Sequence, residues 1–524
     1  MLIDARSLPK DKVIETEVCI VGAGAAGIAL AREFVGQEFR VCLLESGSLG
    51  FEEDTQALYK GENIGLPYFP LHRCRLRFFG GSTNHWDGWC RPLDAIDFET
   101  RDWIPHSGWP FSKSHLGPFY ERAQSICQLG PFTYDVKFWE NPKKSPRLPF
   151  KDGRVITKIY QRSPPTKFGE VYRNEIIHAD NISTYLYTNV VDIETNNTAQ
   201  TVTRVRTATL EGNKFWVLAK LFILATGGIE NARLLLLSNK VQSTGLGNQN
   251  DLVGRFFMEH PAMFSGVFLP SDPHLPLGLY HMVQGKRTIG ALTLAEGVLR
   301  REKMVNISAT LIPVTRLGYY YKTSSRGVTS FRHNLRATRQ GGAPDDFWKH
   351  LRNVLVDTDD VATAIHGKTL NPNFLAIRLY NHIETTPNPK SRVTLSDERD
   401  RLGQNRARLD WRLSAIDKRS MRRAHEIIGQ ELGRAGLGRL KVELGEDDTT
   451  WPSSLKGLSH HMGTTRMHVD PNKGVVDENC KVHGISNLFI AGSSVFPTSG
   501  PNTPTLTIVA LAVRLADHVK KLVS

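Results

Sequence analysis

The sequence predicts an α/β plus α+β protein. A domain with a parallel sheet is assembled from discontinuous segments, and a second domain with a mostly antiparallel sheet is inserted into it. At three places far apart, ending near residues 22, 227 and 492, a short apolar strand runs into glycine and then into a helix. Such crossovers join parallel strands. The middle of the chain, roughly 262–445, mixes strands with basic loops and shows no repeat.

The first crossover lies at the N-terminus. Residues 16–22 are β-branched and apolar and predict a strand that ends in glycine. Small and helix-forming residues follow from 23 to 34 and predict a helix. A second strand is expected over 40–44, and it ends in Glu45-Ser46-Gly47. The segment is therefore one βαβ unit with parallel strands.

Later segments supply the other elements. Residues 78–89 are rich in glycine and aromatic side chains and predict a loop. Strands are expected over 183–187, 190–194, 201–210 and 214–223, and the last runs into Ala225-Thr226-Gly227-Gly228 and a helix. A strand over 488–491 runs into Gly492, and residues 505–520 have helical periodicity. We expect these segments to form one nucleotide-binding domain.

Length, composition and charge exclude several classes of protein. The chain has 524 residues, of which 40% are hydrophobic, so it can bury a large core. Its longest apolar runs fall far short of the ~20 residues of a spanning helix. The first fifteen residues are polar and lack the apolar stretch of a secretory signal. The sequence therefore predicts a cytoplasmic protein without a membrane partner.

The cysteines and the basic charge indicate no further partner. Six cysteines form no CxxC pair, which argues against zinc ribbons and disulfide frameworks, and no metal site is expected. The formal charge of +13 is interpreted as a solvated basic exterior, because the densest basic stretch, 326–352, carries no nucleic-acid-binding signature. Four arginines in that stretch favour anionic substrates: Arg326, Arg332, Arg336 and Arg339.

The glycines of the first crossover carry a dinucleotide fingerprint. Gly22-x-Gly24-x-x-Gly27 follows a strand and opens a helix. Gly22 permits a tight turn, Gly24 allows close approach of a pyrophosphate, and Gly27 allows the helix and strand to pack closely. Glu45 lies 23 residues after Gly22, at the end of the second strand, where it can accept from ribose hydroxyls. We expect a Rossmann-like domain that binds FAD or NAD.

Five further segments decide between these cofactors. They are residues 80–82, 225–235, 253–261, 459–467 and 476–497. These segments resemble landmarks of the glucose–methanol–choline (GMC) family of FAD-dependent oxidoreductases, in family order over nearly the whole chain. The resemblance implies FAD, with a FAD-binding domain over 1–110, 185–262 and 446–524. The substrate domain would then cover 111–184 and 263–445.

The resemblance also implies the catalytic residues. The family's His-x-x-Gly-Thr histidine falls on His460, which would accept the alcohol proton while hydride passes to flavin N5. His461 is the neighbouring competitor, and the spacing to Gly463 favours His460. The second family position falls on Asn502, which would donate a hydrogen bond to the substrate oxygen. Turn formation between two prolines is the alternative role of Asn502.

The same resemblance implies the residues that contact FAD. They are Gly22, Gly24, Ala26, Gly27, Glu45, Gly81, Ser82, Asn84, His85, Val191, Ala225, Gly492 and Thr503. A histidine followed by tryptophan, here His85-Trp86, is tethered to the flavin in relatives resembling pyranose 2-oxidase. Ser-Thr-Asn before His85 departs from that pattern, so non-covalent FAD is favoured and a covalent link stays open. His260 is expected to be a structural connector, and Glu384 a solvated strand residue rather than a substrate contact.

The leading hypothesis is an FAD-dependent alcohol oxidoreductase. Resemblance to pyranose 2-oxidase and to bacterial glycoside 3-oxidases and dehydrogenases favours a secondary hydroxyl of a sugar or glycoside. Oxygen or another acceptor would reoxidise the flavin, and a homo-oligomer is left open. The alternatives are a sterol, aryl alcohol or polyol as substrate, an NAD-dependent enzyme, and a non-catalytic nucleotide-binding protein that docks on nucleic acid. A yellow protein whose flavin absorption is bleached by an alcohol would support the FAD-dependent enzyme over the NAD-dependent enzyme and the non-catalytic nucleotide-binding protein.

Overall fold

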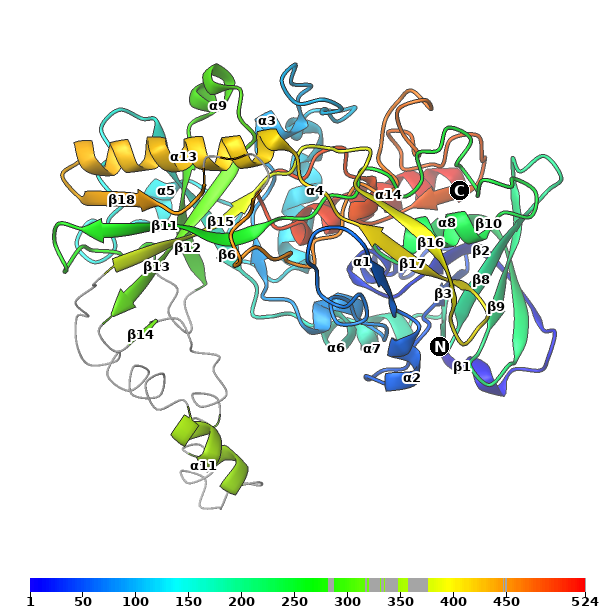
Figure 1. Cartoon of the computed structure of the whole chain (residues 1–524). Coiled ribbons are helices and arrows are strands. Elements are labelled where there is room, and N and C mark those ends of the chain that lie inside the picture. Colours follow the sequence, from blue (N-terminus) through cyan, green and yellow to red (C-terminus); the bar gives the residue numbers. More distant parts are fainter. Residues whose placement is uncertain are drawn as a thin grey trace.

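A parallel-centred sheet forms one end of the molecule, at the right of Figure 1. The computed structural model describes residues 1–280, 287–315, 318–319, 330, 334, 347–356, 376–445, 447 and 450–523. The sheet runs in the order β1 (Leu2–Asp4), β7 (Ile182–Leu186), β3 (Val41–Leu44), β2 (Val13–Val21), β10 (Lys214–Leu224), β9 (Val202–Ala208) and β8 (Asn189–Thr195). Strand β19 (Leu488–Ile490) pairs with β10 on the same sheet. Segments from both ends and the middle of the chain thus share one sheet.

The centre of this sheet is parallel and buried. Strand β2 pairs in parallel with β3 and with β10, whereas β8, β9 and β10 pair antiparallel. The last four residues of β2 and all four of β3 are buried, as expected for strands covered on both faces. Helices α1 (Ala25–Phe34) and α14 (Thr505–Val523) pack on each other, and α4 (Lys113–Ile126) packs on α14. These strands, α1 and α14 confirm the predicted elements. The expected loop at 78–89 contains the turn η2 (Gly81–Asn84) and ends at the first residue of the short strand β5 (Trp89–Cys90).

The other end of the molecule is an antiparallel sheet. It runs in the order β18 (Gly438–Val442), β11 (Ala262–Pro270), β15 (Ala376–Ile383), β13 (Ile307–Thr315), β12 (Thr288–Leu294), β6 (Val155–Arg162) and β5 (Trp89–Cys90). The short strand β14 (Gly318–Tyr319) pairs with β13. Helix α13 (Ala415–Arg434) lies along this end of the molecule in Figure 1 and contacts β18. The predicted fold class, α/β plus α+β with an inserted antiparallel sheet, is confirmed.

A small sheet and several short helices complete the described chain. Strands β16 (Arg392–Arg399), β17 (Asn405–Asp410) and β4 (Gly61–Asn63) form the third sheet, which contacts helix α8 (Glu230–Leu237). The remaining helices are α2 (Glu53–Ala57), α3 (Ala95–Phe98), α5 (Val136–Trp139), α6 (Phe168–Val171), α7 (Arg173–Ile177), α9 (Glu296–Glu302) and α11 (Phe347–Val356). Turns η1 (Ala5–Ser7) and η3 (Ser493–Val495) are of the 3₁₀ type. In Figure 1, α11 projects away from both large sheets.

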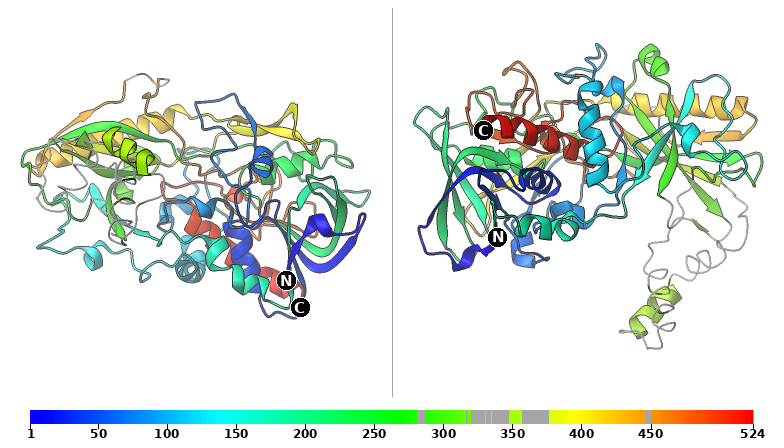
Figure 2. Two further views of the ribbon diagram at one scale, coloured as in Figure 1. Left: turned by 90° about the horizontal axis from the view of Figure 1, so that it is seen from below. Right: turned by 180° about the vertical axis from the view of Figure 1, so that it is seen from behind.

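The packing mixes the two predicted domain ranges. Helix α4 and residues 168–182 contribute to the core around the parallel sheet, although they fall in the range predicted for the substrate domain. Strand β5 pairs with β6 of the antiparallel sheet, although it falls in the first predicted range. Figure 2 shows both termini at the parallel-sheet end from two further sides. The packing of α4, residues 168–182 and β5 does not follow the predicted division of the chain, and the domain boundaries stay a prediction.

Three further sequence predictions concern the cysteines, membrane-spanning helices and a group of arginines. All six cysteines are buried and carry no disulfide. None of the helices in the described part of the chain is long and apolar enough to cross a bilayer. The four arginines that favoured an anionic substrate, Arg326, Arg332, Arg336 and Arg339, lie outside the described residues.

Candidate active site

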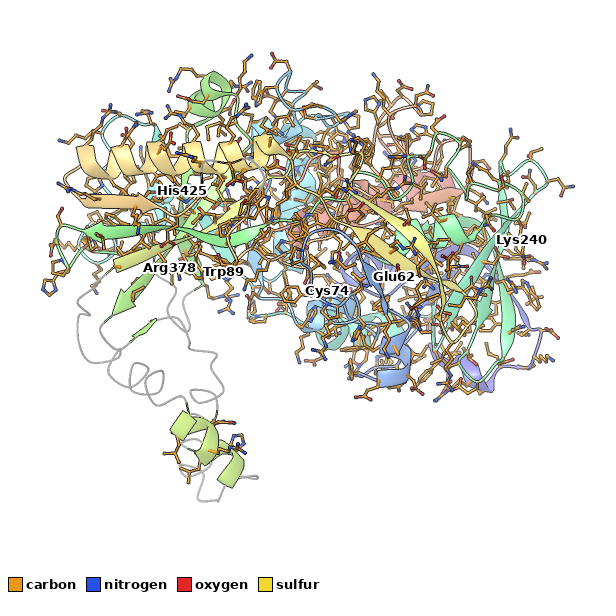
Figure 3. All side chains as sticks on the ribbon, in the orientation of Figure 1. Glu62, Cys74, Trp89, Lys240, Arg378 and His425 are labelled. Carbon is orange, nitrogen blue, oxygen red and sulfur yellow. The ribbon has the colours of Figure 1, made fainter. Side chains whose placement is uncertain are left out.

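A cavity of about 920 Å³ separates the parallel sheet from the antiparallel one. One end is formed by the glycine turn after β2, and the other by one face of the antiparallel sheet. Two residues of its wall are labelled in Figure 3: Trp89 on β5, at the edge of the antiparallel sheet, and Cys74, which lies between the two sheets. The cavity is large enough for a cofactor and a small molecule together.

The glycine turn has the geometry that the fingerprint requires. Gly22 has a φ of +103°, in the region that favours glycine. A Cβ on Gly27 would lie 1.9 Å from the carbonyl oxygen of Gly22, so the helix could not pack this closely with a larger residue. A Cβ on Gly24 would meet nothing within 4 Å, because Gly24 borders the cavity. Helix α1 begins at the next residue, with its free N–H groups at this end.

Glu45 fixes the same turn from the end of β3. It is buried, and its carboxylate accepts hydrogen bonds from the backbone N–H of Ala23 at 3.0 Å and of Gly47 at 2.9 Å. It also borders the cavity. A carboxylate has capacity for more than two hydrogen bonds, so Glu45 can hold the turn and still accept from a ribose.

The expected FAD contacts fall into two groups. Eleven of the thirteen residues border the cavity: Gly22, Gly24, Ala26, Glu45, Gly81, Ser82, His85, Val191, Ala225, Gly492 and Thr503. Gly27 packs beneath the turn, and Asn84 donates to the backbone carbonyls of Phe79 and Gly81 at 3.1 and 3.0 Å, so it shapes the loop. The open space over Gly24, the helix start and the acid together fit a dinucleotide such as FAD.

A buried ion chain borders the cofactor side of the cavity. Arg75 contacts Glu230 at 2.9 Å, Arg233 contacts the other oxygen of Glu230 at 3.1 Å, and Arg233 also contacts Asp400 at 2.7 Å. Burial acts to raise the pKa of Glu230, but the guanidinium groups around it lower this pKa to about 2. This network of ion pairs connects helix α8 to the third sheet. Sequence spacing alone does not predict the network.

Two histidines meet at the substrate side. Nε2 of His260 lies 2.7 Å from the carbonyl oxygen of Gly500, and its Nδ1 lies 2.9 Å from Nδ1 of His460. A carbonyl only accepts, so Nε2 of neutral His260 carries the hydrogen and its Nδ1 accepts. Nδ1 of His460 must then donate, which leaves its Nε2 without a hydrogen. His260, expected to be only a connector, therefore sets the tautomer of His460.

The electrostatics keep both rings neutral. Burial lowers the pKa of His260 to about 4. Burial, followed by the neighbouring His260, His382 and His461, holds the pKa of His460 well below its usual value. Nε2 of His460 is consequently available as a proton acceptor at neutral pH, and His460 borders the cavity.

Glu259 supports both histidines from behind. Its Oε1 accepts from the backbone N–H of His260 at 2.8 Å and of His460 at 2.9 Å. The hydroxyl of Tyr68 lies between Glu259 and Nε2 of His461, which is 2.9 Å away. Burial raises the pKa of Glu259 to about 7. His461 is thereby engaged by Tyr68, although it also borders the cavity.

Asn502 lies behind the wall of the cavity. It is fully buried, its Nδ2 donates to the carbonyl of Pro92 at 2.8 Å, and its Oδ1 accepts from the hydroxyl of Tyr160 at 2.6 Å. Asn502 does not border the cavity, whereas Tyr160 and Thr503 do. The geometry therefore gives Asn502 a positioning role through Tyr160, and its direct contact with substrate stays a prediction.

One face of the antiparallel sheet forms the substrate wall. Residues paired directly across strands share a face. Tyr380 on β15 pairs with Phe264 on β11 and with Thr310 on β13, and His382 pairs with Ser308. All five side chains border the cavity, as do Ile289, Ile312, Lys456 and Trp89. None of these wall residues was identified from the sequence, because their pairing joins segments far apart in the chain.

The environment of Glu384 differs from the one expected from the sequence. It was expected to be a solvated strand residue, but it is fully buried and pairs with Arg101, whose Nη1 donates to its Oε2 at 2.8 Å. The same oxygen accepts from the backbone N–H of Asn306 at 3.0 Å. A buried carboxylate needs such partners to be tolerated. Its place at the end of β15, against the loop around Ser499, explains the burial.

The turn, the cavity and the paired histidines fit a dinucleotide-binding enzyme with a basic imidazole in its substrate half. Residues 387–512 match the family model described as GMC oxidoreductase. The fructose dehydrogenase large subunit of Gluconobacter japonicus is 23% identical over 97% of this chain and 98% of its own. The 2-methyl-1,2-propanediol dehydrogenase of Mycolicibacterium austroafricanum is 24% identical over 97% and 95%.

Two further comparisons concern a short segment of the chain and its fold. The C-glycoside 3-oxidase of Microbacterium trichothecenolyticum is 36% identical, but over only 24% of each chain. The crystal structure of pyridoxine 4-oxidase from Mesorbium loti covers 96% of this chain and 98% of its own with a TM-score of 0.58 and 17% identity, which shows the shared fold. The chain is therefore similar to GMC oxidoreductases, which act on CH–OH donors, in its C-terminal part by the family model and over nearly its whole length by two dehydrogenases. This similarity implies FAD as the cofactor.

Proposed function

We propose that this protein oxidises a secondary hydroxyl of a sugar or glycoside and that His460 is the base. The observation that carries the proposal is the hydrogen-bond chain from Gly500 through His260 to His460, because it presents an unprotonated Nε2 at the cavity wall. A base of this kind takes the proton of a bound hydroxyl as the carbinol C–H bond is broken. Bound FAD supplies the acceptor for the two electrons.

The chain's own residues divide the remaining work. The glycine turn, Glu45 and the loop bearing Gly81 and Ser82 would hold the cofactor. Tyr160 borders the cavity, and Asn502 fixes its position by accepting a hydrogen bond from its hydroxyl. The antiparallel sheet excludes water from one side of the reacting carbon with apolar side chains such as Phe264 and Ile312.

A sugar or glycoside is favoured over other alcohols by two findings. The substrate wall mixes hydroxyl and imidazole groups, which can form hydrogen bonds with several hydroxyls, with aromatic rings; Ser308, Thr310 and Tyr380 are examples. Relatives named for fructose and for C-glycosides support the same class. The relative named for 2-methyl-1,2-propanediol supports a non-sugar diol as the second candidate.

An absorption spectrum with an anaerobic substrate panel tests this proposal. Purified protein should be yellow and should bleach with D-fructose or a methyl glucoside, and recolouring in air would identify an oxidase. A colourless protein that stays apo with added FAD would contradict it. Acid precipitation reports on His85, since a yellow pellet means a covalent flavin and a yellow supernatant a dissociable one. The cytoplasmic location and the oligomeric state stay predictions, which fractionation and light scattering would test.

A further inference from the structure

His382 is a polar group in the cavity wall that the reaction outlined above does not use. It lies on β15, paired with Ala262 on one side and Ser308 on the other, so it shares the cavity-facing side of the sheet with Tyr380. Among the described residues, no hydrogen bond involves its imidazole, and its one aromatic ring contact is with Tyr380, with centroids 5.5 Å apart. His260 and Lys456 are near enough to act on its charge. An imidazole in a protein wall ordinarily has a partner.

The position of His382 relates it to the base. Ala262, its neighbour across the strand pair, follows His260 by two residues, and His260 touches His460. His382 is also close enough to His460 to act on its charge. The free imidazole and the base therefore border the same part of the cavity.

The chemistry of the ring limits what it can bind. Burial lowers the pKa of His382 to about 3, so the ring is neutral and offers one N–H donor and one acceptor nitrogen. A hydroxyl group, which is itself donor and acceptor, matches this pair. A neutral imidazole offers no net charge to a carboxylate or phosphate, whereas it can both donate to and accept from hydroxyl groups.

We propose that His382 binds a second hydroxyl of the substrate, on the carbon next to the one that is oxidised, and so selects vicinal diols such as sugar rings over simple alcohols. The inference rests on the proposed function, because it assigns a second contact to the same site. It follows from two imidazoles that border one part of the cavity, one holding the reacting hydroxyl and one without a protein partner. A substrate lacking the second hydroxyl leaves His382 unpaired, which disfavours its binding and its transition state.

Matched substrate pairs test the inference on the FAD-loaded protein. Methyl β-D-glucopyranoside is compared with its 2-deoxy and 4-deoxy analogues, and 2-methyl-1,2-propanediol with 2-methyl-1-propanol. Anaerobic flavin reduction by the wild type should favour at least one diol over its deoxy partner by about a hundredfold or more in kcat/KM. In His382→Phe this preference should fall to about threefold or less. The rate with the diol should fall, while the rate with its deoxy partner should stay unchanged. His382→Asn, which keeps a donor and an acceptor, should retain an intermediate preference.

Controls separate specificity from folding. His178→Phe replaces an exposed histidine that does not border the cavity, and this variant should keep the wild-type preference for diols. Flavin content and thermal midpoint of each variant are compared with this control, and His382→Asn serves if His382→Phe does not fold. Equal rates with diols and deoxy partners in the wild type, or an unchanged preference in both His382 variants, would overturn the inference while leaving alcohol oxidation intact. Absence of flavin reduction by every compound would overturn the proposed function and the inference together.

Discussion

Nδ1 of His260 lies 2.9 Å from Nδ1 of His460, and the carbonyl of Gly500 holds the other nitrogen of His260. This relationship fixes which nitrogen of His460 is basic. It also joins three parts of the chain that are far apart: the segment before β11, the His-x-x-Gly-Thr motif and the loop before α14. The catalytic tautomer is thus a property of the fold rather than of the motif alone.

Removing the acceptor on His260 should impair the reaction without removing the cofactor. In His260→Phe the rate of anaerobic flavin reduction should fall about ten- to a hundredfold, since His460 is free to adopt the wrong tautomer. His260 also lowers the pKa of His460, so the acid limb of the rate profile should move to higher pH in the variant. Stopped-flow reduction across pH measures both effects. A variant with wild-type rate and profile would show that His260 is only structural.

Glu259 should make stability depend on pH. Burial raises its folded pKa to about 7, above the value of about 4.3 for an unfolded glutamate. The folded state therefore binds more protons, and the free energy of unfolding should fall as pH rises from about 4.3 to about 7. Glu259→Gln should remove this slope and stabilise the protein by on the order of 1–3 kcal/mol above pH 7. Urea unfolding of the two apoproteins measures it; an unchanged slope would refute the raised pKa.

The glycines of the turn should separate cofactor binding from folding. Gly24→Ala places a methyl group in open cavity space, so the apoprotein should unfold at the wild-type temperature but bind FAD at least about tenfold more weakly. Gly27→Ala forces contact with the carbonyl of Gly22 and should cost about 1–3 kcal/mol or more of stability. Calorimetry and flavin fluorescence titration distinguish the two. Normal FAD affinity in Gly24→Ala would place the cofactor elsewhere.

Removing one member of the buried Arg101–Glu384 pair should destabilise the protein much more than replacing both members with apolar residues. Glu384→Gln leaves a buried guanidinium without its charge partner, and we expect a loss of about 3–5 kcal/mol. The double variant Arg101→Met, Glu384→Leu removes both charges and should recover most of that loss. Chemical unfolding of the single and double variants gives the coupling. Equal losses in both would mean that the hydrogen bond to Asn306, rather than the charge pair, carries the effect.

The parallel sheet was predictable because its signals are local. Strands β2, β3 and β10 are apolar runs that end near glycine, and α1 begins within the fingerprint. Glu45 and the glycines lie within one βαβ unit, so spacing alone brings them together. The His460 motif was likewise readable, since its residues are contiguous.

The substrate wall was not predictable for the converse reason. His382 and Ser308 meet only through strand pairing across a long insertion, and Tyr160 reaches Asn502 from more than three hundred residues away. Nothing in the local sequence states the register of an antiparallel sheet of this kind. For Asn502 the motif gives the position along the chain and not the direction of its amide, so its direct contact with substrate stays a prediction.

The most direct test of the central claim is anaerobic flavin reduction by His460→Ala beside the wild type, with D-fructose and methyl β-D-glucopyranoside as donors. Both proteins should bind FAD equally, because His460 lies in the substrate half of the cavity. The wild-type flavin should bleach, and reduction in the variant should be about 10²–10⁴-fold slower. Wild-type rates of bleaching in the variant would contradict the assignment of His460 as the base.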